Sequence, residues 1–243
     1  MPTASSPALR PTLTVEIWSD LICPWCWIGK RRFDEALAAF AHADRVDVAL
    51  RAYRLFPGQP VEPVEAMLAG KYRLAPAQVD QMLRQVTDAA ASVGLRYDLP
   101  GTLVGDTLDG HRLVKLAETT GRAHALTERL YRAYFSEHGA LFDHGALADL
   151  AVDAGLERAA VEAVLRSDAY RSEVDADVAR AEQIGSRGVP LFVFGGRYAV
   201  SGAQPADAFA QALEQAWQDG IVAIGGDDAT ACGPDGCALP PRA

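Results

Sequence analysis

The chain has 243 residues, of which 49% are hydrophobic and 23% are charged. These values are typical of a folded globular protein and argue against a disordered chain, and the length allows one large domain or a domain with an insertion. The formal net charge of −9 argues against a nucleic-acid partner, because binding to phosphates depends on lysine and arginine.

Two features bear on where the protein acts in the cell. Residues 1–11 contain a single cation, Arg10, and lack the apolar segment of a secretory signal. No stretch of the chain reaches the roughly 18 apolar residues that a membrane span requires. We therefore expect a cytoplasmic protein with no membrane partner.

The four cysteines fall into two pairs, Cys23 with Cys26 and Cys232 with Cys237. Four cysteines are too few for a disulfide scaffold at this length, and structural disulfides are rare in the cytosol. Closely spaced cysteines in such a protein indicate a redox-active dithiol or a metal site.

The first predicted elements form a β-α-β unit. Residues 13–18 alternate between apolar and polar side chains and are rich in β-branched and aromatic types, which indicates a strand. Residues 25–40 carry apolar side chains at helical spacing, and residues 46–53 again have the character of a strand. The first cysteine pair therefore lies where a strand is followed by a helix.

From residue 63 to residue 185 the pattern favours one helix after another, with no convincing strand between them. Apolar side chains recur at helical offsets, as in the series Val79, Met82, Leu83, Val86, Ala90 and Val93 and the series Leu126, Leu130, Tyr131, Tyr134 and Phe135. Such stripes are far more often core than cofactor site. We expect a helical insertion domain over residues 63–185.

Strand patterns return after Pro190. Residues 191–194 and 198–201 read as two strands joined by a glycine turn, and a last helix begins at Pro205. We expect a discontinuous α/β domain over residues 12–62 and 186–219, because the two ends complete one small sheet around the insertion. Residues 220–243 are rich in glycine, aspartate and alanine and predict a flexible tail that carries the second cysteine pair.

The position of the first pair assigns roles to its sulfurs. If the helix follows the strand directly, Cys23 is its N-cap and Pro24 occupies the first helical position, where proline is tolerated. A thiolate at Cys23 would then accept hydrogen bonds from the amides of Trp25 and Cys26, which the helix leaves without partners. The helix dipole favours the same anion by about 0.3 to 2 kcal/mol. This predicts Cys23 as the nucleophile and Cys26 as the resolving thiol.

A bare Cys-x-x-Cys motif is a weak signal, because zinc sites use the same spacing. The surrounding sequence adds to it: residues 19–20 and 23–29 (Ser-Asp, then Cys-Pro-Trp-Cys-Trp-Ile-Gly) resemble the active-site segment of the DsbA-like family, most closely its FrnE-like branch. Residues 188–204, which begin Gly-Val-Pro, resemble the second signature of that branch. The resemblance covers roughly residues 12–219.

The resemblance implies a thioredoxin-like fold with a large all-helical insertion. It implies that the peptide bond before Pro190 is cis, so that the backbone of Val189 is exposed to pair with an extended substrate beside Cys23. The branch also carries a His-Arg pair on a helix of the insertion, matched here by His111 and Arg112, although the neighbouring Asn and Ala of the branch are replaced. For His111 this leaves two interpretations, a place in the substrate groove or a hydrogen-bonded structural histidine.

The active-site dipeptide is Pro24-Trp25, whereas the strongly oxidising periplasmic DsbA has Pro-His. Tryptophan offers no second cation beside the nucleophile, so we expect a milder oxidant than that relative. We expect no cofactor and no metal at the predicted site residues.

The second pair has three open interpretations. Glycine and proline between Cys232 and Cys237 favour a tight turn that brings two sulfurs together. The residues that link the pair to the fold give it a reach on the order of 20 Å, so the pair is a candidate electron relay to Cys23. The other two interpretations are an independent disulfide in the tail and a metal-binding site.

The sequence therefore predicts a thiol-disulfide oxidoreductase or disulfide isomerase. Its partners would be disulfide-containing proteins or peptides and a thiol reductant. The alternatives are a glutathione-dependent isomerase or transferase of the same superfamily, whose members usually carry serine in place of the first cysteine, and a zinc protein that uses all four cysteines.

Overall fold

The computed structural model describes residues 12–225, 232–233 and 236–237. A four-stranded sheet in the order β2-β1-β5-β6 lies at its centre. Strand β1 (Leu13–Ser19) pairs in parallel with β2 (Val46–Ala52) and antiparallel with β5 (Leu191–Phe194), which pairs antiparallel with β6 (Tyr198–Ser201). Strand β1 is therefore an interior strand, and the two ends of the chain build one sheet, as the sequence predicted.

Helices α1 (Pro24–Ala39) and α9 (Ala206–Gly225) pack against one face of this sheet. Phe33 of α1 is fully buried, and its ring lies 5.5 Å from that of Phe192 and 6.0 Å from that of Phe209, measured between centroids. Side chains on a strand alternate between its two faces, so Phe192 points to α1 while its neighbour Leu191 points away.

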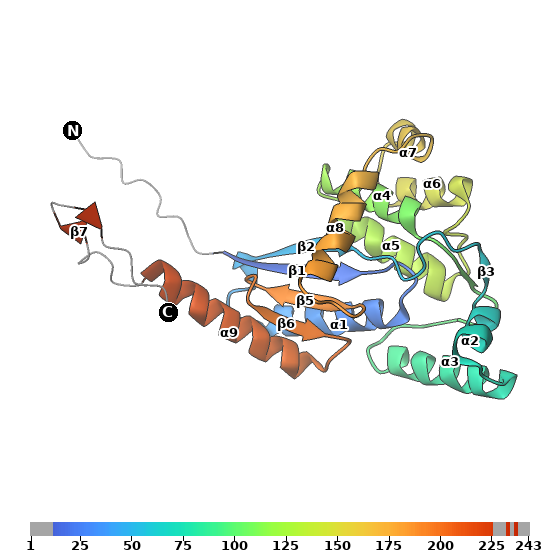
Figure 1. Cartoon of the computed structure of the whole chain (residues 1–243), viewed down its shortest axis with the longest axis horizontal. Coiled ribbons are helices and arrows are strands. Elements are labelled where there is room, and N and C mark those ends of the chain that lie inside the picture. Colours follow the sequence, from blue (N-terminus) through green and yellow to red (C-terminus); the bar gives the residue numbers. More distant parts are fainter. Residues whose placement is uncertain (1–11, 226–231, 234–235, 238–243) are drawn as a thin grey trace.

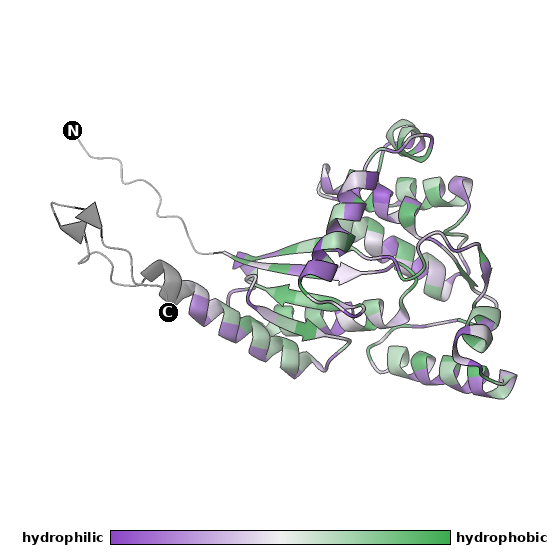
Figure 2. Ribbon diagram, in the orientation of Figure 1, coloured by the Kyte–Doolittle hydropathy of each residue, from purple (hydrophilic) through white to green (hydrophobic). Residues whose placement is uncertain are grey.

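Helix α8 (Arg171–Gln183) covers the opposite face (Figure 1). Trp18 of β1 packs there with Ala181 and Leu191, and its indole nitrogen donates to the backbone oxygen of Asp177 at 2.8 Å. In Figure 2 the strands carry many hydrophobic residues, while α8 is largely hydrophilic. Helix α8 is therefore joined to the sheet by polar contacts as well as by apolar packing.

The segment between β2 and β5 is mainly helical and gathers at the end of the sheet where β1 finishes (Figure 1). Besides α8, it contains α2 (Val64–Tyr72), α3 (Pro76–Ala91), α4 (Leu108–Glu118), α5 (Ala123–Ser136), α6 (His144–Asp153) and α7 (Arg158–Leu165). The short 3-10 helix η1 (Ala43–Arg45) lies earlier in the chain, directly before β2.

Two details differ from the sequence predictions. Strands β3 (Glu62–Pro63) and β4 (Leu103–Val104) form an antiparallel ladder, so the inserted region is not entirely helical. Two residues are too few to show the alternation by which strands are recognised. Helix α9 continues to Gly225, beyond the start of the predicted tail, because a single interior glycine at position 220 costs a helix only about 1 kcal/mol.

Residues 1–11, on which the expectation about a signal segment was based, lie outside the described residues. Among the helices that the structure describes, none combines the length and the apolar character needed to cross a membrane.

Candidate active site

The dithiol lies at the junction between β1 and α1. Cys23 is the N-cap of α1 and has extended backbone angles, and Pro24 is the first helical residue. The amide of Cys26 donates to the carbonyl oxygen of Cys23 at 3.0 Å, which closes the first turn. The predicted strand-to-helix junction is confirmed, and both cysteines belong to the buried core, with 4% of Cys23 and 1% of Cys26 exposed.

The Cys23 thiol donates to the backbone oxygen of Val189 at 3.6 Å and makes no capping contact with α1. The sulfur of a protonated thiol is only a weak acceptor, so the absence of a capping contact here does not conflict with the amide contacts predicted for the thiolate. The peptide bond between Val189 and Pro190 is cis, as the resemblance implied. Residues 166 positions apart in the sequence therefore meet at one sulfur.

A glycine on α1 allows Pro190 to approach the dithiol closely. A Cβ atom added to Gly29 would lie 3.0 Å from Cγ of Pro190 and 3.4 Å from Cα of Ala203. Contacts this short require Pro190 or Ala203 to move by a few tenths of an ångström, so glycine at this position permits the close packing of Pro190 on α1.

The environment of Cys26 favours its protonated form. Burial raises the pKa of the Cys26 thiol well above its ordinary value, and the hydrogen bond and charge of Cys23 raise it further. A backbone hydrogen bond from Asp20 lowers it, whereas the carboxylate charge of Asp20 raises it. The surroundings of Cys26 thus disfavour its thiolate form.

Aromatic side chains support the first turn of α1. The Trp27 ring stacks on those of Tyr97, Tyr131 and Phe135 at centroid distances of 5.7 to 5.9 Å. The Tyr97 hydroxyl donates to the carbonyl oxygen of Pro24 at 2.8 Å, and burial raises the pKa of this hydroxyl far above its ordinary value. Sequence reasoning missed Tyr97, because a tyrosine in the loop after α3 carries no pattern that links it to residue 24.

Asp20 and His111 form a buried pair behind the dithiol. Asp20 is fully buried, its Oδ2 accepts from the Leu55 amide at 2.6 Å, and its backbone oxygen accepts from the Cys23 amide at 3.2 Å. Its Oδ1 lies 3.6 Å from Nε2 of His111, which is 3% exposed. This burial favours the interpretation of His111 as a structural histidine over its placement in a substrate groove.

The remaining predicted site residues are placed as follows. Trp25 lies beside Cys23 at the surface, with 42% of the residue exposed. Strands β7 (Cys232–Gly233) and β8 (Gly236–Cys237) form an antiparallel ladder in which Cys232 is the register partner of Cys237. The side chains of this second pair lie outside the described residues.

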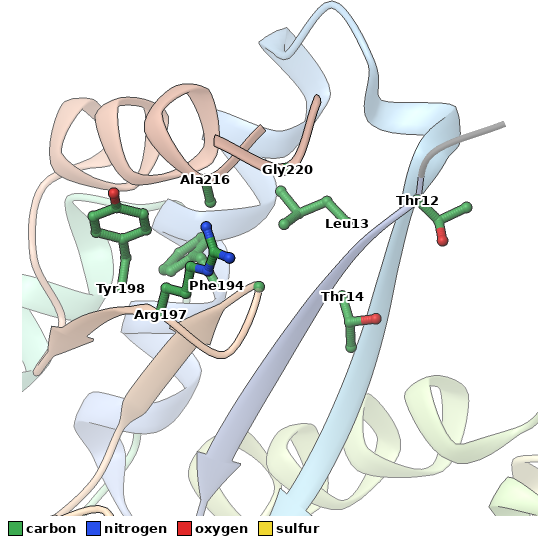
Figure 3. Close-up of a pocket in the computed structure, with 9 residues that line it drawn as sticks. Thr12, Leu13, Thr14, Phe194, Arg197, Tyr198, Ala216 and Gly220 are labelled. Atoms are coloured by element: carbon green, nitrogen blue, oxygen red, sulfur yellow. The ribbon is translucent and has the colours of Figure 1, made fainter. Parts of the chain in front are cut away.

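A cavity of about 300 Å³ lies at the other end of β1 from the dithiol (Figure 3). It is lined by the start of β1, by the turn between β5 and β6, and by Ala216 and Gly220 of α9. Among the described residues that line it, Arg197 is the charged one. The reactive sulfurs are thus not in this cavity.

The sheet order, a Cys-x-x-Cys motif at a helix N-terminus and a cis proline facing the first cysteine define the chain as a thioredoxin-like protein. A family model described as the DSBA-like thioredoxin domain matches residues 14–214. The chain belongs to this family, which places it among the DsbA-like thiol oxidoreductases and isomerases.

Individual relatives agree with this assignment. The chain is 45% identical to a probable DsbA oxidoreductase from Streptomyces coelicolor, with a TM-score of 0.82 and coverage of 94% of this chain and 100% of that one. It shares the fold of the cytosolic disulfide reductase DsbM from Pseudomonas aeruginosa, solved with GSH, at 21% identity, a TM-score of 0.60 and coverage of 84% and 99%. It is also 23% identical to the uncharacterized protein YwbO of Bacillus subtilis, over 83% of this chain and 96% of that one.

Proposed function

We propose that the chain is a thiol-disulfide oxidoreductase or disulfide isomerase that acts on protein or small disulfides through Cys23 and Cys26. The observation that carries this proposal is the contact of the Cys23 thiol with the carbonyl oxygen of Val189 beside the cis Pro190. Cys23 attacks a substrate disulfide to form a mixed disulfide, and Cys26 then attacks Cys23 and releases the substrate as a thiol.

The first turn of α1 supports the attacking role of Cys23. The amides at a helix N-terminus have no intrahelical partners, and the side chain of Cys23 makes no capping contact in its thiol form. When Cys23 loses its proton, these amides are available to the anion, which the helix dipole stabilises by up to about 2 kcal/mol. Cys26, which burial keeps protonated, is the poorer first nucleophile.

The substrate in this proposal is an extended peptide that pairs with the backbone of Val189. The exposed ring of Trp25 offers it an apolar surface beside the reacting sulfur. Because this position holds no cation, the protein is a milder oxidant than a Pro-His relative. We place the reaction in the cytoplasm, with a thiol compound as the reductant.

Insulin reduction tests the proposal. The unsubstituted chain should precipitate insulin in the presence of dithiothreitol, and Cys23→Ser should abolish the activity. Cys26→Ser should instead accumulate a mixed disulfide on Cys23, visible by mass spectrometry. Activity that survives Cys23→Ser would refute the proposed mechanism. Metal analysis and thiol counting on the same sample test the competing zinc interpretation.

For the second pair we propose an electron relay to Cys23. The register places Cys232 opposite Cys237, and facing residues in an antiparallel ladder have Cα atoms about 4.5 to 5.5 Å apart, within the range that a disulfide spans. Serine at both positions should slow turnover with a small-molecule reductant. Unchanged turnover and redox potential would leave the pair as an independent disulfide.

A further inference from the structure

A groove of about 430 Å³ lies on the face of the sheet that points away from α1. Its floor contains Leu191 and Val193 of β5 and Ala199 of β6, the register partner of Val193. Alternate residues of a strand share a face, so these side chains lie on the side opposite to Phe192 and α1. Residues 184–187, which follow α8, form one wall of the groove.

The groove is continuous with the backbone that faces the dithiol. Val189, whose carbonyl oxygen accepts from the Cys23 thiol, packs in the same apolar cluster as Leu191 and Val193 of the floor. An extended chain advances about 3.3 Å per residue, so a peptide that faces Val189 reaches the groove within one or two residues. A bound substrate therefore passes along this wall.

The wall places an arginine beside that path. The Ser186 hydroxyl donates to the carbonyl oxygen of Gly188 at 2.9 Å, which fixes the turn before Val189. Arg187 lies inside this turn, two residues before Val189, and is exposed. Its side chain makes no hydrogen bond or ion pair with any residue that the structure describes. Its guanidinium is thus available to a ligand in the groove.

The groove is positively charged, although the chain as a whole carries a net charge of −9. The described residues that line it include two arginines, Arg187 and Arg197, and neither an aspartate nor a glutamate. Arg197 also lines the cavity of Figure 3, in the turn between β5 and β6, which leaves Arg187 as the cation beside the dithiol. An apolar floor with a cation at its rim is complementary to a segment that carries apolar and acidic side chains.

We propose that the groove binds the part of the substrate next to its reacting cysteine, and that Arg187 selects substrates with an acidic side chain there. A guanidinium donates two parallel hydrogen bonds to a carboxylate, which fixes both partners in one geometry. The side chain of Ile184, which is 48% exposed at the wall, adds apolar surface for the neighbouring substrate residues. This inference rests on the proposed function and names the substrate class of the same site.

A series of peptides tests this selectivity. Each peptide carries one cysteine in a mixed disulfide with 2-thiopyridine, and a single glutamate is moved through a neutral sequence around that cysteine. A peptide with glutamine in the same place is the reference. The reduced chain carries Cys232→Ser and Cys237→Ser, so that only the first pair reacts. The Cys23 thiolate attacks the peptide sulfur, and the thiopyridine leaves as a thiol whose absorbance gives the second-order rate constant.

Glutamate at one or two adjacent positions should raise this rate constant about threefold to fivefold over glutamine, as expected for an ion pair at an exposed arginine. Arg187→Gln should remove the preference, and Arg187→Glu should transfer it to a lysine peptide. Arg166→Gln is the matched control, because it removes one cation from α7, where the side chain is 69% exposed, and it should keep the preference. Equal preference in Arg187→Gln and the unsubstituted chain would overturn the proposal.

A second variant tests the groove itself. Ala199 is exposed on the floor, so Ala199→Glu adds a negative charge there without disturbing the core. It should lower the rate constant of the glutamate peptide below that of the glutamine peptide. An unchanged ratio would show that the substrate does not lie in this groove.

The same measurements separate this inference from the proposed function. Thiopyridine release that persists in Cys23→Ser would refute the attack by Cys23, and with it the proposed function. Release that depends on Cys23 but is equally fast for every peptide would refute only the role of Arg187.

Discussion

Replacing Asp177 of α8 by alanine removes the contacts of its side chain with Ala52 and Arg51 of β2 and with Lys115 of α4. Oδ2 of Asp177 accepts from the buried amide of Ala52 at 2.9 Å and lies 2.7 Å from Nζ of Lys115. Oδ1 lies 3.5 Å from Arg51, whose side chain is 30% exposed. Both Asp177 and Lys115 are buried, so water cannot replace what the substitution removes.

The size of the loss follows from these contacts. An unpaired buried amide costs about 1 to 3 kcal/mol, and breaking a buried ion pair costs about 3 to 5 kcal/mol. We take the lower end of both costs, because Lys115 keeps its contact with Glu118. We assign no cost to the contact with Arg51, whose side chain is partly exposed. Asp177→Ala should therefore lower the free energy of unfolding by about 4 kcal/mol, which lowers the Tm by about 8 to 16 °C.

Urea denaturation and thermal unfolding of the reduced chain measure this loss. Asp177→Asn keeps an acceptor for the Ala52 amide and should lose only the ion-pair part, about 3 kcal/mol. Asp175→Ala is the control on the same helix, because the side chain of Asp175 is 56% exposed and loses a single contact with Arg54, at 3.7 Å. Its effect on the free energy of unfolding should stay within about 0.5 kcal/mol. A loss below about 1 kcal/mol for Asp177→Ala would show that these contacts do not hold α8 to the sheet.

Three further predictions concern the dithiol and the core. Folding raises the pKa of Cys26, so the unfolded reduced chain ionises first above the ordinary thiol value of about 8.5, and stability should fall by up to about 1.4 kcal/mol per pH unit from there. Urea titrations of Cys26→Ser should lack the part of this slope that the thiol contributes. Tyr97→Phe loses the hydrogen bond to Pro24 but keeps the ring stack, and should cost about 1 kcal/mol by thermal unfolding; a cost above about 3 kcal/mol would contradict this account. Phe33→Ala should cost about 3 to 5 kcal/mol in urea, since the ring is fully buried among other aromatic rings, and a cost near zero would mean that the core refills the space.

Local patterns predicted most of the elements around the site. The strand ending at Ser19, the helix that begins at Pro24 and the hairpin after Pro190 each have a short-range signal, namely alternation, a tolerated N1 proline and a glycine turn. The same signals placed Cys23 at the N-cap. The sequence did not predict β4, because two residues are too few to show alternation. It also ended α9 too early, because the helix tolerates an interior glycine.

The sequence by itself determined that two cysteines one turn apart open a helix after a buried strand, because capping and periodicity depend on neighbours in the chain. Only the tertiary structure decided which distant groups surround them. The Tyr97 hydroxyl at Pro24 and the Asp20–His111 pair are contacts across long sequence separations. They depend on how the sheet and the inserted helices pack, which leaves no local pattern in the chain.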